Sequence, residues 1–229
     1  MISQAGIEQV LATFSPHLHL VDVQGWLTPV QQQALHALAA LTRGPVLEIG
    51  PWIGRSTCCL ARGLLLRSER MPGDRVVSIE LNPDDSYFRR NADGDVEFWC
   101  PGDTEMRGIA KADLFDTHAA PVISSPGGIV ARLKETLARH HLQHLVEIIV
   151  GDFKDVLPVA RYGLIFSDVC HTPYEIERMV AGLRPVLTPG TLLCCHDTTP
   201  ENRDALEQAI AYDWTTMSGS LHIGMIGEA

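Results

Sequence analysis

The sequence lacks the features that mark a secreted or membrane-bound protein. Its first residues have no basic region followed by an apolar run, and no apolar stretch is long enough to span a bilayer. Basic residues are also scarce: 18 Lys and Arg against 28 Asp and Glu give a net charge of -10, which argues against nonspecific nucleic-acid binding. We therefore expect a cytoplasmic protein whose partners are small molecules, not nucleic acids or membranes.

Disulfides and zinc sites are not indicated either. The chain has six cysteines but no C-x-x-C pair and no spacing typical of a zinc site. Because unpaired cysteine is among the most buried residue types, we expect reduced thiols in the core or near the site. The cysteines are Cys58, Cys59, Cys100, Cys170, Cys194 and Cys195.

Residues 46–57, V-L-E-I-G-P-W-I-G-R-S-T, predict a buried strand, a glycine turn and a helix. Gly50 and Gly54 allow a tight turn and leave room for a ligand beside the backbone. Ser56 and Thr57 are expected to cap the helix. The spacing differs from G-x-G-x-x-G, and the Gly-Lys-Ser/Thr ending of a phosphate loop is absent.

Glu48 precedes the first glycine and gives the pattern E-x-G-x-x-x-G. A carboxylate at this point suits a cationic amino group better than a pyrophosphate. The stretch resembles the first motif of the class I S-adenosylmethionine-dependent methyltransferases, and E-I-G-P-W-I-G-R-S-T is similar to their small-molecule O-methyltransferase branch. The resemblance implies that Glu48, Gly50, Trp52, Gly54 and Ser56 bind S-adenosylmethionine.

Strand-like and helical runs alternate along the chain, which is typical of a parallel sheet covered by helices on both faces. We therefore predict an α/β, doubly wound fold with a closing hairpin near the C-terminal end. The resemblance implies a seven-stranded, mostly parallel sheet of the Rossmann-like methyltransferase type, in a single domain over residues 1–229. The predicted strands are 46–49, 75–80, 146–150, 164–167 and 191–196, and the hairpin strands are 214–217 and 221–226.

The N-terminal segment, residues 1–44, is predicted to be helical. Ile7, Val10, Leu11 and Phe14 have helical spacing. A second helix is expected to begin at Thr28-Pro29-Val30-Gln31, because Thr28 can cap it and Gln31 can reach back.

The connection between the second and third predicted strands is too long for one crossover helix. A helix is expected over residues 130–140, so the excess, about residues 84–124, is interpreted as an insertion. It is either a lid that recognises the substrate or a mobile surface loop. Phe98, Trp99 and Met106 favour the lid.

Two further strand ends fit an adenosyl cofactor. Glu80 ends the second strand beside the glycine turn, where a carboxylate can accept hydrogen bonds from both hydroxyls of a ribose. The third strand ends at Gly151-Asp152, and the resemblance implies that an acid here lies beside the adenine amino group. A helix N-cap by Asp152 is the alternative interpretation.

Asp168 ends the fourth predicted strand, and His196-Asp197 ends the fifth. Adjacent strands of a doubly wound sheet place such ends over one crevice, so the three side chains can converge. A resemblance to the metal-dependent O-methyltransferases implies that they hold a divalent cation, with Asp168 also beside the cofactor. Histidine in place of an oxygen ligand either shifts the preference from magnesium toward metals that accept nitrogen or does not ligate.

The resemblance to the catechol-type O-methyltransferases, which have a basic residue poised on the substrate hydroxyl at this place, implies that His171 is the general base. It follows Asp168 by three residues, and an imidazole near its reference pKa of about 6.5 accepts a proton at neutral pH. His196 is the alternative base, and Asp168 completes the predicted catalytic set. A loop histidine that bonds backbone groups is the competing interpretation for either histidine.

The sequence thus predicts an enzyme that transfers a methyl group from S-adenosylmethionine to an oxygen of a small molecule, with or without a divalent metal. A hydroxylase-like enzyme on the same fold and a noncatalytic cofactor-binding protein are the alternatives. The acceptor is not indicated, and a homo-oligomer is left open.

Overall fold

The computed structural model describes residues 3–13, 20–169 and 171–228. Seven strands form one sheet in the order β6-β2-β1-β7-β8-β10-β9, with β10 antiparallel to both of its neighbours. This order confirms the predicted mostly parallel, doubly wound α/β sheet. The strands are β1 (Val46–Ile49), β2 (Val76–Glu80), β6 (Val146–Val150), β7 (Leu164–Ser167), β8 (Leu192–Cys195), β9 (Tyr212–Ser218) and β10 (Leu221–Ile226).

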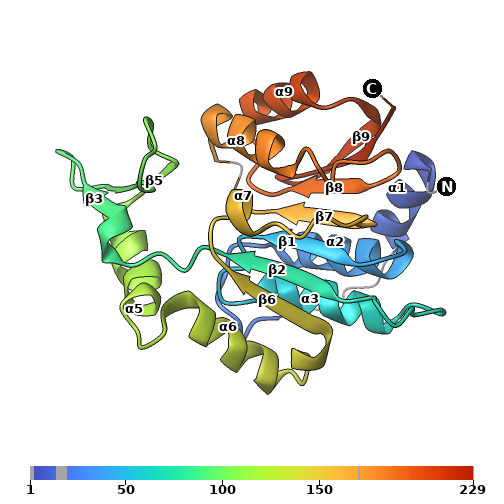
Figure 1. Ribbon diagram of the computed structural model, residues 1–229, viewed down its shortest axis with the longest axis horizontal. Coiled ribbons are helices and arrows are strands. Elements are labelled where there is room, and N and C mark those ends of the chain that lie inside the picture. Colours follow the sequence, from blue (N-terminus) through green and yellow to red (C-terminus); the bar gives the residue numbers. More distant parts are fainter. Residues whose placement is uncertain (1–2, 14–19, 170, 229) are drawn as a thin grey trace.

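Helices cover both faces of the sheet (Figure 1). Successive strand residues face opposite ways, so Val46 of β1 packs in the core beneath α2, α3 and α6, whereas Leu47 packs beneath α8 and α9. None of the helices in the described ranges is both long and apolar enough to cross a bilayer. The helices on the sheet are α1 (Gln4–Thr13), α2 (Pro29–Leu41), α3 (Arg55–Leu65), α6 (Gly128–Arg139), α7 (Phe153–Val156), α8 (Pro173–Leu183) and α9 (Pro200–Ala209), with a 3-10 turn, η3 (Gln143–Leu145), before β6.

Two helices, α1 and α2, form in the N-terminal segment, whereas residues 20–28 before α2 are not helical. Thr28 caps α2 in a capping box with Gln31, as expected. Phe14, assigned to the first helix, and Cys170 lie outside the described residues. The other five cysteines are buried, as expected for cysteines of the core.

The predicted insertion folds into a small unit of its own, which lies beyond the carboxyl ends of the parallel strands (Figure 1). Three short strands form an antiparallel sheet in the order β3-β4-β5, followed by short helical segments that lead into α6. The elements are η1 (Asp85–Tyr87), β3 (Phe88–Arg90), β4 (Val96–Phe98), β5 (Gly108–Ala110), α4 (Ala112–Leu114), the π-helical η2 (Phe115–Ala119) and α5 (Ala120–Ile123).

The helix after the glycine turn, α3, is held against α2 by a very close approach at Gly63. A Cβ atom at this position would lie 2.3 Å from the backbone oxygen of His36 and 2.7 Å from Cβ of Ala39. The contact requires glycine, since any side chain would push the two helices apart. It therefore helps to fix where α3 begins, beside the turn.

We expect Gly63→Ala to lower the free energy of unfolding by about 1–3 kcal/mol, because overpacking displaces α2 from α3. Urea unfolding followed by circular dichroism measures this. Gly73→Ala is the matched control, because no atom lies within 4 Å of a Cβ there, and the change should stay within about 0.5 kcal/mol. Equal midpoints for the two variants would contradict the close contact.

Candidate active site

A cavity of about 360 Å³ lies at the carboxyl ends of the parallel strands, between the sheet and the insertion. Crevices at this edge are the usual ligand sites of doubly wound sheets. The predicted site residues that line the cavity are Gly50, Trp52, Glu80, Gly151, Asp152, Asp168, His171 and Asp197. The predicted site residues that are not part of its lining are Glu48, Gly54, Ser56 and His196.

The glycine turn forms as predicted, but its helix cap differs. Gly54 is the N-cap of α3, with a φ of 102° and no side-chain hydrogen bond, so the prediction that Ser56 and Thr57 cap the helix was wrong. The helix starts at Arg55, which places both hydroxyl residues inside its first turn, buried next to Glu48. Glycine is required at the cap because a side chain there is strained and its Cβ would lie 2.7 Å from Cδ1 of Leu133.

Glu48 lies behind the turn and is fully buried. Its carboxyl group accepts a hydrogen bond from Oγ of Ser78 at 2.7 Å. Burial raises the pKa of Glu48, and the hydroxyl groups of Ser56, Ser78 and Thr57 act in the opposite direction. A direct contact between Glu48 and a cationic amino group stays a prediction, because the carboxyl group is beneath the cavity wall and not in it.

Glu80 lies at the end of β2 and lines the cavity. Its Oε1 accepts a hydrogen bond from the backbone N–H of Asn82 at 2.9 Å. Burial raises the pKa of Glu80 to about 7, although backbone N–H groups of Asn82 and Trp52 stabilise the charged form. The carboxyl group is therefore poised to change its charge near neutral pH.

Asp152 has the helix-capping role that was the alternative interpretation of the sequence, and it also lies in the cavity wall. It is the N-cap of α7, because its side chain accepts from the backbone N–H of Lys154, and it also lines the cavity. Burial opposes its ionisation, but hydrogen bonds from Lys154 and Arg107 lower the pKa of Asp152 overall. Its contact with an adenine amino group stays a prediction.

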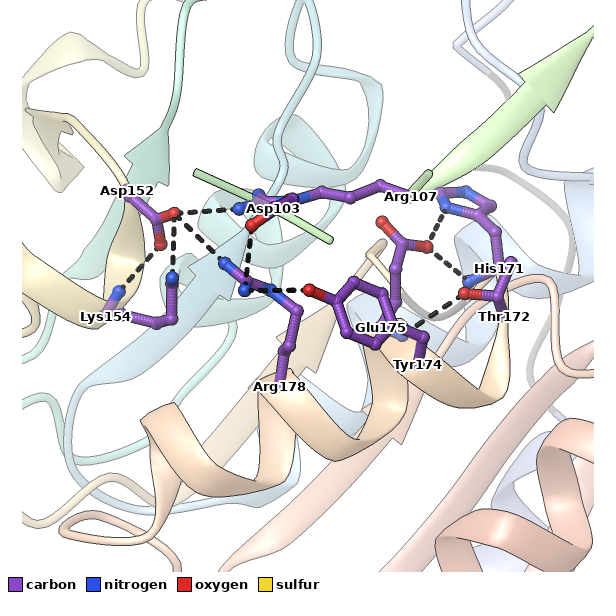
Figure 2. A network of polar contacts seen from close by, with 9 residues as sticks. All are labelled: Asp103, Arg107, Asp152, Lys154, His171, Thr172, Tyr174, Glu175 and Arg178. Carbon is purple, nitrogen blue, oxygen red and sulfur yellow. Dashed lines mark hydrogen bonds and ion pairs between the residues drawn. The ribbon is translucent and has the colours of Figure 1, made fainter. Parts of the chain in front are cut away.

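An ion-pair network that the sequence did not indicate ties the insertion to this strand end (Figure 2). Arg107, next to β5, contacts Asp152 at 3.1 Å and Asp103 at 2.6 Å. Arg178 of α8 contacts Asp103 at 2.9 Å. Asp103 and Arg107 follow a Pro-Gly turn with no motif around them, so only the folded chain brings them to Asp152.

Asp168, His171 and Asp197 bring three ligand atoms within 4.8 Å of one another, which would suit a metal ion. The predicted metal set contained His196 where the geometry has His171. His196 is 2% exposed, and its Nδ1 lies 2.8 Å from Oδ1 of Asp168. His196 therefore holds the carboxylate of Asp168 in place. Groups that hydrogen-bond to a metal ligand without contacting the metal have this role in known metal sites. The binding of a metal stays a prediction.

Glu175 is a site residue that sequence reasoning missed. It is buried, and its Oε2 accepts from the backbone N–H and lies 2.9 Å from Nδ1 of His171 (Figure 2). The signal was present in Thr172-Pro173-Tyr174-Glu175, since Thr172 caps α8 and an acid at the third position after a cap can reach back.

The carboxylates around His171 hold its proton strongly. Desolvation disfavours the charged ring, although the side chain is 44% exposed, but Glu175, Asp168 and Asp197 outweigh it and raise the pKa of His171 to about 10. A histidine of this kind is protonated at neutral pH when no cation is bound beside it. It is then a poorer general base than the sequence alone suggested, because the ideal base has a pKa near the working pH.

Some of the large apolar residues of the insertion line the cavity, and others lie outside it. Phe98, which favoured a lid, lines the cavity, as do Phe88 and Phe115. Trp99 instead donates its Nε1–H to Glu97, and Met106 is not part of the lining. A role of the insertion as a lid stays a prediction.

Comparison with known proteins agrees with this geometry. Residues 47–198 match the family model of the methyltransferase domain, and no curated protein sequence matches the chain. The O-methyltransferase TomG from Streptomyces achromogenes, involved in tomaymycin synthesis and solved with S-adenosylmethionine, has 18% identity and a TM-score of 0.51 over 100% of this chain and 92% of that one.

Two further solved structures resemble the chain at low identity. The TDP-rhamnose 3′-O-methyltransferase of calicheamicin biosynthesis has 16% identity and a TM-score of 0.58, over 97% of this chain and 92% of that one. The O-methyltransferase from Bacillus cereus, solved with S-adenosylhomocysteine, has 16% identity and a TM-score of 0.50, over 99% and 92% of the two chains. At identities this low, the likeness to these solved structures establishes the fold alone.

The family model matches more than half of the chain, from the glycine turn through Glu80 and Asp168 to Asp197. The chain therefore belongs to the methyltransferase-domain family, in agreement with the resemblance of its glycine turn to that of the class I S-adenosylmethionine-dependent methyltransferases.

Proposed function

We propose that this protein transfers the methyl group of S-adenosylmethionine to an oxygen of a small molecule. The observation that supports the proposal is one cavity lined both by Gly50 and Trp52 of the motif and by an acidic cluster at the next strand ends. Structural neighbours solved with S-adenosylmethionine or S-adenosylhomocysteine, and named as O-methyltransferases, support the cofactor and the oxygen acceptor.

The residues at the glycine turn fit the cofactor. Gly50 and Trp52 line the cavity together with Glu80, and a carboxyl group at this strand end can accept hydrogen bonds from ribose hydroxyls. Leu81 and Phe153, which follow the two strand-end acids, add apolar side chains suited to an adenine ring. When bound, S-adenosylmethionine supplies a methyl group on a sulfonium, and an oxygen nucleophile takes it by direct displacement.

The protein's own contribution is then to orient the acceptor oxygen and to remove the proton of the acceptor hydroxyl. Glu175 fixes the His171 ring through Nδ1, which leaves Nε2 on the side of Asp197, 3.9 Å away. His196 fixes Asp168 in the same way. Side chains held by such second partners lose little freedom when a ligand arrives.

We further propose that Asp168, His171 and Asp197 hold a divalent cation. Their ligand atoms are clustered and carboxylates are in surplus. Both features favour a bound cation over a site in which His171 acts as a base without a metal. A bound cation would lower the pKa of an acceptor hydroxyl that it touches. His171 must lose its proton to ligate, so cation binding and ring protonation compete.

We expect Glu80→Gln to weaken S-adenosylmethionine binding by at least about tenfold at pH 8, because a neutral amide is a weaker acceptor for two hydroxyls than a carboxylate. Isothermal titration calorimetry measures the affinity. Since the pKa of Glu80 is raised to about 7, the wild-type carboxyl group is mostly protonated at pH 6, so binding should be weaker at pH 6 than at pH 8.

The pH effect should be much smaller in Glu80→Gln, which corrects for titration of the cofactor's own amino group. Glu147→Gln, at an exposed strand position paired with Arg75, is the matched control and should bind like the wild type. Equal affinity in the Glu80 and Glu147 variants would contradict the ribose role.

The reaction class is tested by product mass. We expect the protein, supplied with S-adenosylmethionine carrying a deuterated methyl group and a panel of phenols, to give a product that contains the labelled methyl group. A product that gained an oxygen atom would indicate the hydroxylase-like alternative. Cofactor binding without any product from any acceptor would favour the noncatalytic alternative.

Manganese binding tests the cation site. We expect one Mn²⁺ per chain by calorimetry, with an affinity that rises by up to about tenfold per pH unit between pH 6.5 and 8.5 as the His171 proton becomes easier to displace. Asp168→Asn should weaken binding by at least about tenfold. Asp155→Asn, an exposed acid on α7, serves as the control, and unchanged binding in Asp168→Asn would place the metal elsewhere.

A further inference from the structure

The insertion presents a group of phenylalanine rings to the cavity. Phe88 on β3 and Phe98 on β4 face each other across the small sheet, with ring centroids 5.3 Å apart and an angle of 24° between the planes. Phe115 on η2 adds a tilted ring 5.0 Å from Phe88. All three line the cavity and are only partly buried, so an apolar ligand ring would remove further aromatic surface from water.

A second aromatic pair lines the same cavity from another part of the chain. Trp52 of the glycine turn and Trp26 have ring centroids 5.8 Å apart. Nε1 of Trp52 is buried and has no hydrogen-bond partner among the described residues. The cavity therefore has aromatic side chains from two separate parts of the chain in its lining.

The charges that line the cavity disfavour an anion. Arg107 is occupied by two carboxylates, Asp103 and Asp152, and His171 is held by Glu175. Both cations are thus paired with carboxylates, and the surplus of acids in the lining repels an incoming phosphate or sulfonate. The acidic residues of the lining are Glu80, Asp152, Asp168, Glu175 and Asp197.

We propose that the acceptor is an uncharged, planar aromatic compound with a hydroxyl group, and not a phosphorylated or nucleotide-linked sugar. This inference rests on the methyltransferase function proposed above and specifies its acceptor. The phenylalanine rings of the insertion cover the aromatic body, and the acidic cluster lies in the same cavity to receive the hydroxyl group. The insertion is then the segment that selects the acceptor by shape and polarity.

Binding to the protein saturated with S-adenosylhomocysteine tests the inference without any methyl transfer. The probes are 2-naphthol, its 6-sulfonate and thymidine diphosphate, each titrated by calorimetry. We expect 2-naphthol to bind at least about tenfold more tightly than the sulfonate, because the two differ by one negative charge that the cavity repels. Thymidine diphosphate should bind more weakly than 2-naphthol for the same reason.

Substitutions separate ring stacking from general apolarity. Phe98→Leu and Phe115→Leu keep an apolar side chain and should weaken 2-naphthol binding by about threefold or more, with S-adenosylhomocysteine binding unchanged. Trp99→Leu is the control, because the ring adjoins Phe98 in sequence but lies against Arg89 and outside the cavity. Asp103→Asn should narrow the preference for 2-naphthol over the sulfonate, since Arg107 and Arg178 each then lose a carboxylate partner and the negative charge of Asp103 is removed. Melting curves establish that each variant is folded.

Tighter binding of the sulfonate or of thymidine diphosphate than of 2-naphthol would overturn the inference, as would wild-type 2-naphthol affinity in both phenylalanine variants. Failure to bind S-adenosylhomocysteine would instead overturn the proposed function. The two failures are distinguished because cofactor binding is measured first and alone.

Discussion

The in-register pairing of the parallel strands is the constraint on which the site depends. Ile49 of β1 lies opposite Ile79 of β2 and Ser167 of β7, and Ser167 in turn lies opposite Cys195 of β8. Each of these strands therefore ends at the same level, and the residue that follows emerges at one edge of the sheet. A shift of register by one residue would turn every side chain of a strand to the other face and remove its strand-end group from the cavity.

The insertion is attached to that edge by charge as well as by chain connection. Arg107 shares Asp103 with Arg178 and reaches Asp152, the residue that also caps α7 (Figure 2). Partly buried ion pairs of this kind add little net stability, because desolvation offsets most of the attraction, but they penalise other arrangements. The network thus favours one position of the insertion relative to the sheet. This position places the aromatic side chains of the insertion at the cavity.

The same balance of charge gives the cavity its chemical character. Acids predominate at the strand ends, and the two cationic groups of the lining are each held by a carboxylate. A site of this composition attracts a metal ion or another cation and repels anions, while its aromatic walls favour flat apolar groups. Under the proposed function, the proton of the acceptor would be handled near His171 and the rest of the acceptor would be recognised by the aromatic walls of the same cavity.

Local pattern in the sequence determined the strands, the glycine turn, the cap at Thr28 and the strand-end acids, because strand periodicity and turn chemistry depend on neighbouring residues. It did not determine that α3 begins at Arg55, that Glu175 holds His171, or that His171 and not His196 joins Asp168 and Asp197. Those outcomes depend on distances between side chains from different elements, which only packing sets. The sequence thus specified which strand ends would meet at the cavity. The tertiary structure decided which side chains reach into it and that an aromatic insertion closes its far wall.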